Sequence, residues 1–550
     1  MKNEVVVKIG LFKFIIKIAE GFAVCVDPAD RRIRYKKLEI PENVEYDGKN
    51  YVVKETNFSS FEGCKAEEIV LPSTLETIKY SFTRCRNLKK IIIPKSVKII
   101  GDGSFCNCPS LNDIYFEGNP DDIIIQVSAF SNSGWINKKL EKLNDEFYSP
   151  SVEEQVIYLG KNLVGVWREI KELRVKPGTR NVYLYNCSAL EKIFFPSSID
   201  TLDVNTVTNL KEVHYETMES FLGLNQMSDF RQRENFDLYI GGEKITNLEI
   251  PMGTKILRRY LTHKTTVNNI DIPHGLNFIY DFAVSEDIND VYFPKDVGYV
   301  ASRNFGHKVI LWSSLARRIL TSFCNIEKLT ILVEPLLGNK RYCVGYGFVF
   351  PQECITISII FTFDPCPSEV TKFFKDIWPQ ISSYYNKWRN LYLSPEALLC
   401  EDFIKSSSVL SSVKYRGKCI YVPPYLVEKF KNHAVWSQFT VMPGEYSSSL
   451  KYEVLDDSTA CVICNPNEEG NNNYSGLFRI PDYIEVDGSL HKISEISDFA
   501  FSSISDRLRV IVPWDIKISD LAFFDSPKVE IINYVEDITN IEDGSDSNEQ

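Results

Sequence analysis

Residues 61–116 read FEGCKAEEIVLPSTLETIKYSFTRCRNLKKIIIPKSVKIIGDGSFCNCPSLNDIYF, and one pattern occurs three times along this stretch. Phenylalanine and cysteine both return at intervals of 21 and 23 residues. The recurring positions are Phe61, Phe82 and Phe105, followed by Cys64, Cys85 and Cys108. A constant period in the low twenties indicates a solenoid, because one such turn cannot bury its own apolar side and must stack on the next.

The repeating unit has the form F-x-x-C-x-x-L-x-x-I-x-I-P-x-x-V-x-x-I. Its I-x-I portion alternates like a short β-strand, as in residues 91–93. The proline that follows ends the strand, because it has no N–H to donate to a neighbouring strand. These features resemble the BspA-type leucine-rich repeat family, which is common among surface proteins of gut and oral bacteria. The resemblance is close in residues 61–116 and recurs over most of the chain. It implies a curved ladder with a β-sheet on one side and a role in binding or adhesion without catalysis.

The fold class that we predict is a β-rich leucine-rich-repeat solenoid with a period of about 22 residues, β-hairpin caps and a few short helices. Two tandem arrays are expected, because segments of the first return near the end of the chain. IPENVEYDG at 40–48 returns as IPDYIEVDG at 480–488. ISDFAF at 496–501 returns as ISDLAF at 518–523, so a second cap is followed by about two turns.

The predicted domain organisation follows the interruptions of the repeat. In chain order the parts are an N-terminal hairpin cap (1–58), a main repeat array (59–333) with insertions at 117–170 and 216–247, an irregular insertion (334–390), a terminal capping module (391–445), a second short cap with its own repeats (446–535) and an acidic tail (536–550). The tail is expected to be disordered, because it is acidic and lacks apolar periodicity.

The charge and the N-terminal stretch limit the compartments and partners. A net charge of −12 argues against nucleic acid or an anionic membrane surface as the partner. No transmembrane segment is expected, because no apolar run approaches about 18 residues. Three lysines interrupt the first apolar stretch, and residues 13–28 return at 451–466, so folded structure is favoured over a cleaved signal. The residues alone favour an intracellular protein, whereas the family resemblance favours the cell surface or secretion.

Residues capable of catalysis or metal binding do not form a recognisable motif. The six histidines are scattered, and Cys461 and Cys464 of the sole C-x-x-C point to opposite faces of an alternating strand. Four of the fourteen cysteines occupy one repeat position, so we expect buried thiols there and no disulfides. These are Cys64, Cys85, Cys108 and Cys187. We expect no catalytic residue, no cofactor and no metal ion.

The predicted sheet supplies the candidate binding face. In each I-x-I strand the outer two residues face the core, so the middle one points away from it. We call these middle residues the outward row: Val70, Ile92, Tyr115, Phe194, His214, Glu249, Asp271, Tyr292 and Ile310. An exposed apolar and aromatic row is typical of an interface. The alternative is that neighbouring side chains or insertions cover it.

A second aromatic group lies in the irregular insertion and at its end. Its members are Phe373, Phe374, Trp378, Tyr384, Tyr385, Trp388 and Tyr392. Two interpretations are open, a local core beneath the insertion or a platform that binds sugar or protein.

Three functional hypotheses follow from the sequence. The first is a non-enzymatic protein-binding scaffold that acts in adhesion or in recognition of a host or neighbouring cell through the sheet face. The second is a structural or self-associating protein, and the third is an enzyme with an undetected site in 334–390. The identity of the partner, the oligomeric state and the packing between the arrays stay open.

Overall fold

The structure is a computed structural model in which two compact units are distinguished, and each is described by itself. Unit 1 comprises Met1–Thr246 with Arg258–Val267, and unit 2 comprises Asn247–Leu257 with Asn268–Gln550. The residues described are 4–28, 33–126, 128–141, 143, 151–184, 187–204, 207–224, 226–227, 234–285, 287–301, 306–315, 326–335, 354–381, 389–400, 418–444, 450–464, 476–504, 508–513 and 515–532. The acidic tail and, within the irregular insertion, residues 336–353 and 382–388 lie outside these ranges.

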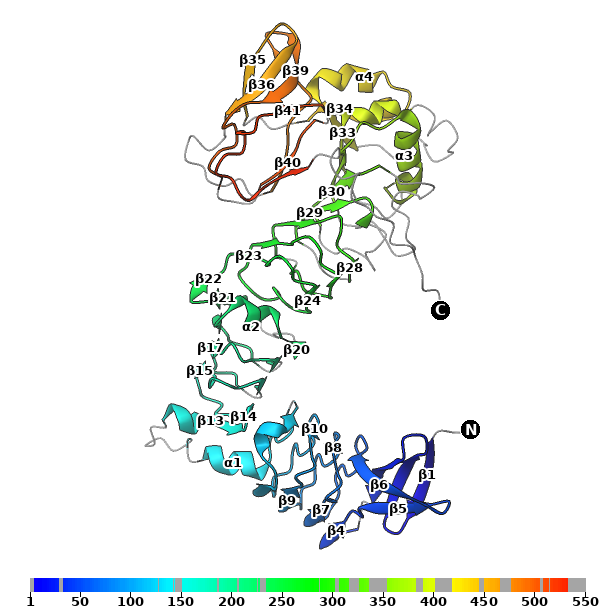
Figure 1. The fold of residues 1–550 in the computed structure, drawn as a ribbon, viewed down its shortest axis with the longest axis vertical. Coiled ribbons are helices and arrows are strands. Elements are labelled where there is room, and N and C mark those ends of the chain that lie inside the picture. The colour runs from blue at the N-terminus through cyan, green and yellow to red at the C-terminus, as the bar shows by residue number, and fades with distance from the viewer. Residues whose placement is uncertain are drawn as a thin grey trace. The chain divides into compact units, whose positions relative to one another are not determined.

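Unit 1 begins with antiparallel strands that continue into parallel ones (Figure 1). The order is β1 (Glu4–Ile9), β2 (Phe12–Lys17), β3 (Phe22–Pro28), β6 (Lys49–Thr56), β8 (Thr77–Ile78), β10 (Ile99–Ile100) and β12 (Ile124–Ile125), with β5 (Asn43–Tyr46) paired to β6. The β5–β6 turn holds Asp47 and Gly48 at φ values of 49° and 71°. This left-handed pair is the conformation that a two-residue hairpin turn requires, and Asp-Gly suits it.

A second sheet of unit 1 is parallel throughout and contains the first I-x-I strands. Its order is β11 (Asp113–Phe116), β9 (Lys90–Ile93), β7 (Glu68–Val70) and β4 (Lys37–Glu39). Ile91 pairs with Ile69 on one side and with Ile114 on the other, at sequence separations of 22 and 23 residues. Neighbouring strands of this sheet therefore belong to successive repeats.

The repeat phenylalanines form a continuous stack inside unit 1. Ring centroids of Phe61, Phe82, Phe105 and Phe130 follow one another at 4.9, 5.3 and 5.5 Å. All four side chains are almost completely buried. Each ring thus covers the ring of the next repeat, which a single repeat could not do for itself. The Cys85 thiol lies beside this stack and donates to the carbonyl oxygen of Phe61 at 3.1 Å, as a buried small side chain.

The remainder of unit 1 repeats this arrangement with two further sheets and two short helices. One sheet has the order β13 (Val156–Leu159), β14 (Asn162–Val166), β16 (Asn181–Tyr183), β18 (Thr201–Asp203) and β20 (Gln226–Met227). The other has the order β15 (Glu172–Arg174), β17 (Lys192–Phe195), β19 (Glu212–Tyr215), β21 (Asp237–Ile240) and β22 (Glu243–Lys244). The helices are α1 (Gly134–Glu141) and α2 (Met218–Leu222).

Unit 2 opens with short parallel pairs and continues as a longer parallel sheet. The pairs are β23 (Asn247–Glu249) with β25 (Asn269–Asp271), and β24 (Ile256–Leu257) with β26 (Phe278–Ile279) and β28 (Tyr299–Val300). The longer sheet has the order β27 (Asp290–Phe293), β29 (Lys308–Trp312), β30 (Lys328–Val333), β31 (Thr356–Phe361), β32 (Asn390–Leu393), β33 (Cys419–Val422) and β34 (Thr440–Pro443). The helices are α3 (Pro367–Ile381) and α4 (Val427–Lys431).

The last part of unit 2, residues 450–532, is called the C-terminal module. One sheet has the order β35 (Lys451–Val454), β36 (Thr459–Cys464), β39 (Ser489–Ile496) and β38 (Tyr483–Val486), with β41 (Lys517–Ile518) also paired to β39. The other has the order β37 (Gly476–Arg479), β40 (Leu508–Ile511) and β42 (Val529–Ile532). Asp487 and Gly488 repeat the left-handed turn of Asp47 and Gly48, at φ values of 49° and 80°.

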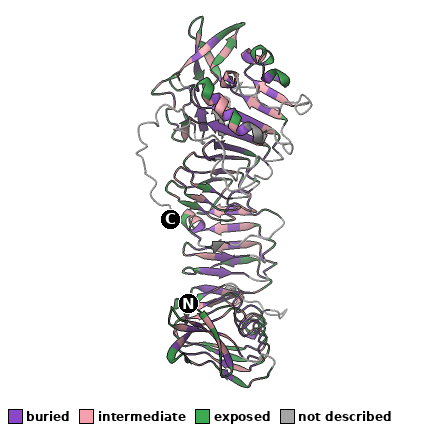
Figure 2. Ribbon diagram, turned by 90° about the vertical axis from the view of Figure 1, so that its right-hand side faces the viewer, coloured by how far each residue is buried: buried purple, intermediate pink, exposed green. Residues whose placement is uncertain are grey.

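Burial alternates along many of the strands, as Figure 2 shows by the change from purple to pink or green, whereas β29, β30 and β40 of unit 2 are buried at nearly every position. In β9, for example, Ile91 and Ile93 are buried whereas Lys90 and Ile92 are exposed. The alternation is what a sheet with one face on the core requires. The core of the C-terminal module is separate and includes Ile493, Phe501 and Val510.

Candidate functional site: the outward face of the sheets

The outward row begins in unit 1 with open positions. Val70 is half-buried, Ile92 is exposed, and Tyr115 exposes 53% of its surface. Tyr115 pairs with Ile92 across β11 and β9, so their side chains lie next to each other on the same face. The Lys90 ammonium lies 5.2 Å from the centre of the Tyr115 ring. This part of the row offers apolar and aromatic surface to solvent.

Further along unit 1 the outward row becomes a stacked column. Phe194 lies 4.1 Å from His214 and His214 lies 4.2 Å from Tyr239, measured between ring centroids, with interplanar angles of 19° and 12°. The guanidinium of Arg174 extends the stack and lies 3.8 Å from the centre of the Phe194 ring. Strand register brings these residues together, because β15, β17, β19 and β21 pair in parallel. We call Arg174, Phe194, His214 and Tyr239 the aromatic column.

Two members of the aromatic column were absent from the row that the sequence predicts. Arg174 and Tyr239 occupy the middle of Leu173–Arg174–Val175 and Leu238–Tyr239–Ile240, which follow the same apolar-x-apolar pattern. The signal for both was therefore present in the sequence. The row also continues in unit 2 beyond the predicted positions, where Tyr392 stacks on Tyr421 at 4.6 Å.

Ion pairs border the aromatic column. Glu212 accepts from Lys192 at 2.6 Å and lies 3.0 Å from Nε2 of His214. The hydrogen bond from Lys192 is the main reason why the pKa of Glu212 lies below its ordinary value. Asp237, which is in register with Glu212, accepts from Lys244 at 2.7 Å. The column is thus an aromatic strip with charges along one edge.

In unit 2 the outward row has different surroundings. Tyr292 exposes only 4% of its surface and Ile310 is also buried, although both are at outward positions of their strands. Asp271 is half-buried, and Glu249 is exposed but bonded to Lys528 at 2.6 Å. At Tyr292 and Ile310 the outward row is therefore covered by other parts of the chain, which is the alternative that the sequence left open.

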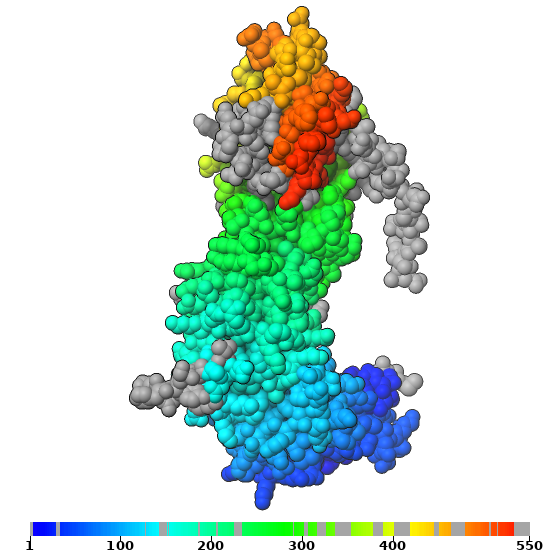
Figure 3. All heavy atoms as spheres, turned by 60° about the vertical axis from the view of Figure 1, so that its left-hand side comes forward, coloured from blue at the N-terminus to red at the C-terminus, as the bar shows by residue number. Residues whose placement is uncertain are grey.

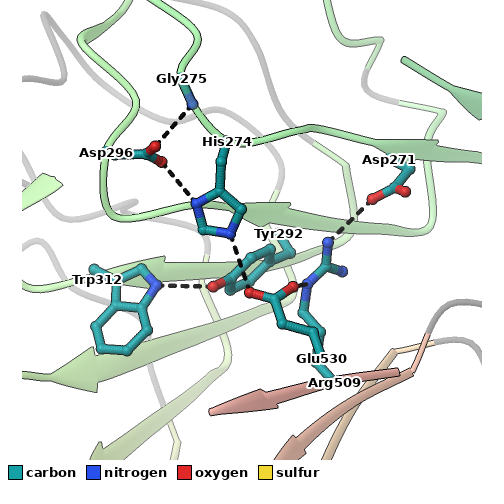
Figure 4. Close-up of polar contacts among 8 residues, drawn as sticks. All are labelled: Asp271, His274, Gly275, Tyr292, Asp296, Trp312, Arg509 and Glu530. Carbon is teal, nitrogen blue, oxygen red and sulfur yellow. Dashed lines mark hydrogen bonds and ion pairs between the residues drawn. The ribbon is translucent and has the colours of Figure 1, made fainter. Parts of the chain in front are cut away.

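Residues of the C-terminal module cover Tyr292 (Figure 4). The Arg509 guanidinium lies 3.8 Å from the centre of the Tyr292 ring, and its side chain is 9% exposed. Arg509 also donates to Asp271 at 3.0 Å and to Glu530 at 3.1 Å. The Tyr292 hydroxyl accepts a hydrogen bond from the Trp312 indole at 2.9 Å. Arg509 is therefore both stacked and paired, in a site with little solvent.

His274, in the turn after β25, joins the same group of residues. Its Nδ1 lies 3.0 Å from Asp296, and its Nε2 lies 3.2 Å from Glu530 of β42. Asp296 also accepts from the backbone N–H of Gly275 at 2.8 Å. We call Asp271, His274, Tyr292, Asp296, Arg509 and Glu530 the docking cluster.

The docking cluster joins two outward sheet faces. Leu508 and Val510 of β40 belong to the core of the C-terminal module, so Arg509 between them points away from that core. Glu530 pairs with Arg509 across β42 and β40 and shares its face. Figure 3 shows the orange-to-red surface of the C-terminal module against the green surface that includes β25 and β27. The outward face of β40 and β42 thus contacts the outward face of β25 and β27.

A cavity of about 410 Å³ also lies in unit 2, between the turn at 423–425 and the second cap. Tyr425, Tyr452 and Tyr483 line it together with Arg479. Arg479 lies 3.3 Å from Asp482 and 3.8 Å from Glu396, whose pKa is raised by burial.

The remaining predicted groups are placed as follows. Phe373 and Phe374 are fully buried in α3, and Phe374 packs edge-on against Trp436 at 5.4 Å, as a local core would require. The side chains of Trp378, Tyr384, Tyr385 and Trp388 lie outside the described residues. Within the described ranges, no group of three or more His, Cys, Asp or Glu side chains is arranged to hold a metal ion. None of the helices in these ranges is both long and apolar enough to cross a membrane.

Comparison with known families identifies the repeat. The model of the BspA type leucine rich repeat region matches in six copies over residues 35–149 and 237–331. No curated protein matches the chain.

Several solved structures share a low level of similarity with the chain. A leucine-rich repeat protein from Bacteroides ovatus is 16% identical, with 79% of this chain and 99% of that chain covered and a TM-score of 0.24. A leucine-rich repeat protein from Eubacterium ventriosum is 13% identical, with 82% and 98% covered and a TM-score of 0.26. A leucine rich cell surface protein from Faecalibacterium prausnitzii is 10% identical, with 67% and 97% covered and a TM-score of 0.19. At these scores the similarities carry no argument about function.

The family match and the parallel strands agree on the nature of the repeat. The fold is strand-rich with a few short helices, and its I-x-I strands pair in parallel one repeat apart. The resemblance seen in the sequence is confirmed: this chain carries BspA-type leucine-rich repeats, in the two regions 35–149 and 237–331.

Proposed function

We propose that this chain is a non-enzymatic protein-binding scaffold and that its recognition face is the outward row of unit 1. The observation that carries the proposal is the aromatic column, which lies on the face of the sheet opposite the core. Arg174 at its end is 64% exposed, and Phe194 and Tyr239 are half-buried. Aromatic and arginine side chains are enriched among the residues that dominate binding energies at protein interfaces.

The rigidity of the aromatic column favours binding. Each ring lies within 4.2 Å of the next, and the backbone beneath is held by parallel strand pairing. A partner would therefore lose little side-chain entropy from this surface on binding. The ion pairs along the edge, such as Lys192 with Glu212, would favour partners of complementary charge.

The wider architecture that we propose is a solenoid of about 22 residues per turn in two tandem arrays, with the domain boundaries predicted from the sequence. Pair separations of 22 for Leu248 with Ile270 and 21 for Leu508 with Val529 support this period in unit 2. The family resemblance supports recognition of a host or neighbouring cell, in adhesion at a cell surface, as the setting.

The test is a binding comparison between two phenylalanines of unit 1 that lie outside the core. Phe194→Ala removes a ring from the aromatic column, whereas Phe58→Ala removes a ring that is 67% exposed and lies outside the outward row. A partner is first isolated from surface extracts of host or neighbouring cells and its Kd for the wild-type chain is measured. We expect Phe194→Ala to weaken binding by a factor of about 30, the equivalent of about 2 kcal/mol for an interface hot spot.

The opposite result would refute the proposal. If Phe194→Ala folds and binds like the wild type whereas Phe58→Ala weakens binding, the aromatic column is not the recognition face. The self-associating alternative predicts that the captured partner is the chain itself. Size-exclusion chromatography with light scattering separates the two, because a binding scaffold of this kind elutes as a monomer in the absence of its partner.

A further inference from the structure

The unit 2 part of the outward row and the C-terminal module carry complementary charges. Glu249 and Asp271 belong to the row, and each pairs with a cation of the module, Lys528 at 2.6 Å and Arg509 at 3.0 Å. The two residues of each pair are more than 230 positions apart in the sequence. Opposite charges at matched positions indicate that the two faces are electrostatically complementary. A shifted arrangement of the two faces would place like charges next to each other.

His274 adds a requirement for protonation to this contact. Each of its ring nitrogens lies within hydrogen-bond distance of a carboxylate, Nδ1 of Asp296 at 3.0 Å and Nε2 of Glu530 at 3.2 Å. A neutral imidazole has a single N–H, so one nitrogen would direct its lone pair at a carboxylate oxygen. Only the imidazolium donates at both nitrogens. The geometry in Figure 4 is therefore that of a protonated histidine between two acceptors.

We propose that the outward face of β23, β25 and β27 is a docking surface whose occupant is the C-terminal module of the same chain, and that docking takes up a proton on His274. Arg509, stacked on Tyr292, supplies a pH-independent part of the contact, because a guanidinium stays charged throughout the physiological range. His274 supplies the part that responds to pH.

The direction of the pH effect follows from the groups around the ring. The hydrogen bond with Glu530 and the charge of Asp296 raise the pKa of His274 above its ordinary value, whereas partial burial opposes them. The nearby cations are Arg509, which shares Glu530, and Lys255, which lies 3.4 Å from the Gly275 carbonyl oxygen. Protonated His274 stabilises the docked state fully at pH values below about 6.5, the ordinary pKa that His274 has when the module is undocked. This stabilisation is lost as pH rises through the higher pKa that His274 has when the module is docked. Docking should therefore be tighter at pH 6 than at pH 8.

Hydrogen exchange measured by mass spectrometry tests the proposal on the full chain. The observable is the protection of β40 and β42 amides between pH 6 and pH 8, after correction for the intrinsic pH dependence of exchange. Amides of β9 in unit 1 serve as the internal reference. We expect the protection factors of β40 and β42 amides to fall as pH rises. If docking raises the pKa of His274 by one, the protection factors should fall by about tenfold.

Three variants isolate the contribution of His274. His274→Asn should remove the pH dependence and leave a protection close to the wild-type value at pH 8. His307→Asn is the matched control, because His307 lies 3.4 Å from Glu327 in a more exposed pair, and it should keep the wild-type pH dependence. Asp296→Asn should keep the module docked at pH 8, because its amide can donate to Nδ1 of a neutral imidazole. This third variant distinguishes proton linkage from a purely structural role.

Two outcomes would overturn the proposal. Protection that does not change with pH, or that changes equally in His274→Asn, would show that His274 does not couple protonation to docking. Protection that falls on dilution of the protein would show that the occupant is the module of a second copy. Neither outcome depends on whether the aromatic column of unit 1 binds a partner, so this proposal and the proposed function can fail separately.

Discussion

Two arginines lie over aromatic rings of the outward row at the same distance, one in each unit. Arg174 is 3.8 Å from the ring of Phe194 in unit 1, and Arg509 is 3.8 Å from the ring of Tyr292 in unit 2. The Arg174 side chain is 64% exposed, whereas that of Arg509 is 9% exposed and bonded to two carboxylates. The same contact is thus open to solvent in one unit and enclosed in the other.

The difference shows how one repeat can supply two kinds of surface. The strand pattern directs the middle residue of each I-x-I strand away from the core in both units. What then covers that residue depends on the rest of the chain. In unit 2 the C-terminal module covers Tyr292, whereas in unit 1 Tyr115 is left half-exposed and available to a partner.

The largest loss of stability is expected from a substitution in the core, and substitutions in the outward row can be compared with it. Phe82→Ala removes a fully buried ring that stacks between Phe61 and Phe105. The resulting cavity should lower the free energy of unfolding of unit 1 by about 3–5 kcal/mol, measured by denaturant titration. Phe58→Ala serves as the control, since Phe58 lies mostly in solvent. Equal stability of the two variants would show that the assignment of inward and outward faces is wrong.

Arg509→Ala should have the next largest effect, on unit 2. It leaves Asp271 and Glu530 without their shared cation and removes the guanidinium from the Tyr292 ring. We expect a loss of about 2–3 kcal/mol in the opening free energy of β40, measured by hydrogen exchange. Arg509→Lys should recover part of this loss, because it keeps the charge but not the forked geometry. A loss below about 0.5 kcal/mol, typical of a surface site, would mean that the contact is not enclosed.

Arg174→Ala is the matched change in unit 1 and should be much milder. An exposed cation–π contact is worth about 0.5–1 kcal/mol, so the thermal stability of unit 1 should change little. The ion pair with Glu172 at 2.8 Å adds little at this exposure. If Arg174→Ala and Arg509→Ala destabilise their units equally, the comparison between an open and an enclosed row fails.

Phe194→Ala should lower the free energy of unfolding by only about 1 kcal/mol, because it removes the ring contacts with Arg174 and His214 but no part of the core. Its neighbour Phe195→Ala changes a buried ring and should lower the free energy of unfolding by about 3 kcal/mol or more. Melting temperatures of the two variants measure this contrast between adjacent residues of β17. A Phe194→Ala variant that melts as low as Phe195→Ala would place Phe194 in the core.

The sequence predicted those features that depend on neighbours within one repeat. The spacing of Phe61, Phe82 and Phe105 indicated the stack, because each ring meets the same residue one repeat away. The Asp47–Gly48 turn was predictable for a similar reason, since its conformation is local. Arg174 and Tyr239 could also have been included in the outward row, because their strands carry the same alternation.

The coverage of the row in unit 2 could not be predicted in the same way. Asp271 and Arg509 are 238 positions apart, and neither departs from the strand pattern around it. Their pairing depends on how the C-terminal module packs, which repeat periodicity does not specify. For this reason Tyr292, predicted on the pattern alone to be part of a binding face, is buried.

Hydroxyl-radical footprinting of Tyr115 and Tyr292 in one sample tests the central claim most directly. Both tyrosines are at outward positions of I-x-I strands, but Tyr115 is 53% exposed and Tyr292 is 4% exposed. Tyr115 should be modified rapidly and Tyr292 slowly in the wild type, and Arg509→Ala should accelerate modification of Tyr292 alone. Equal rates for both tyrosines in the wild type, or a Tyr292 rate that Arg509→Ala leaves unchanged, would contradict the claim that the C-terminal module covers Tyr292.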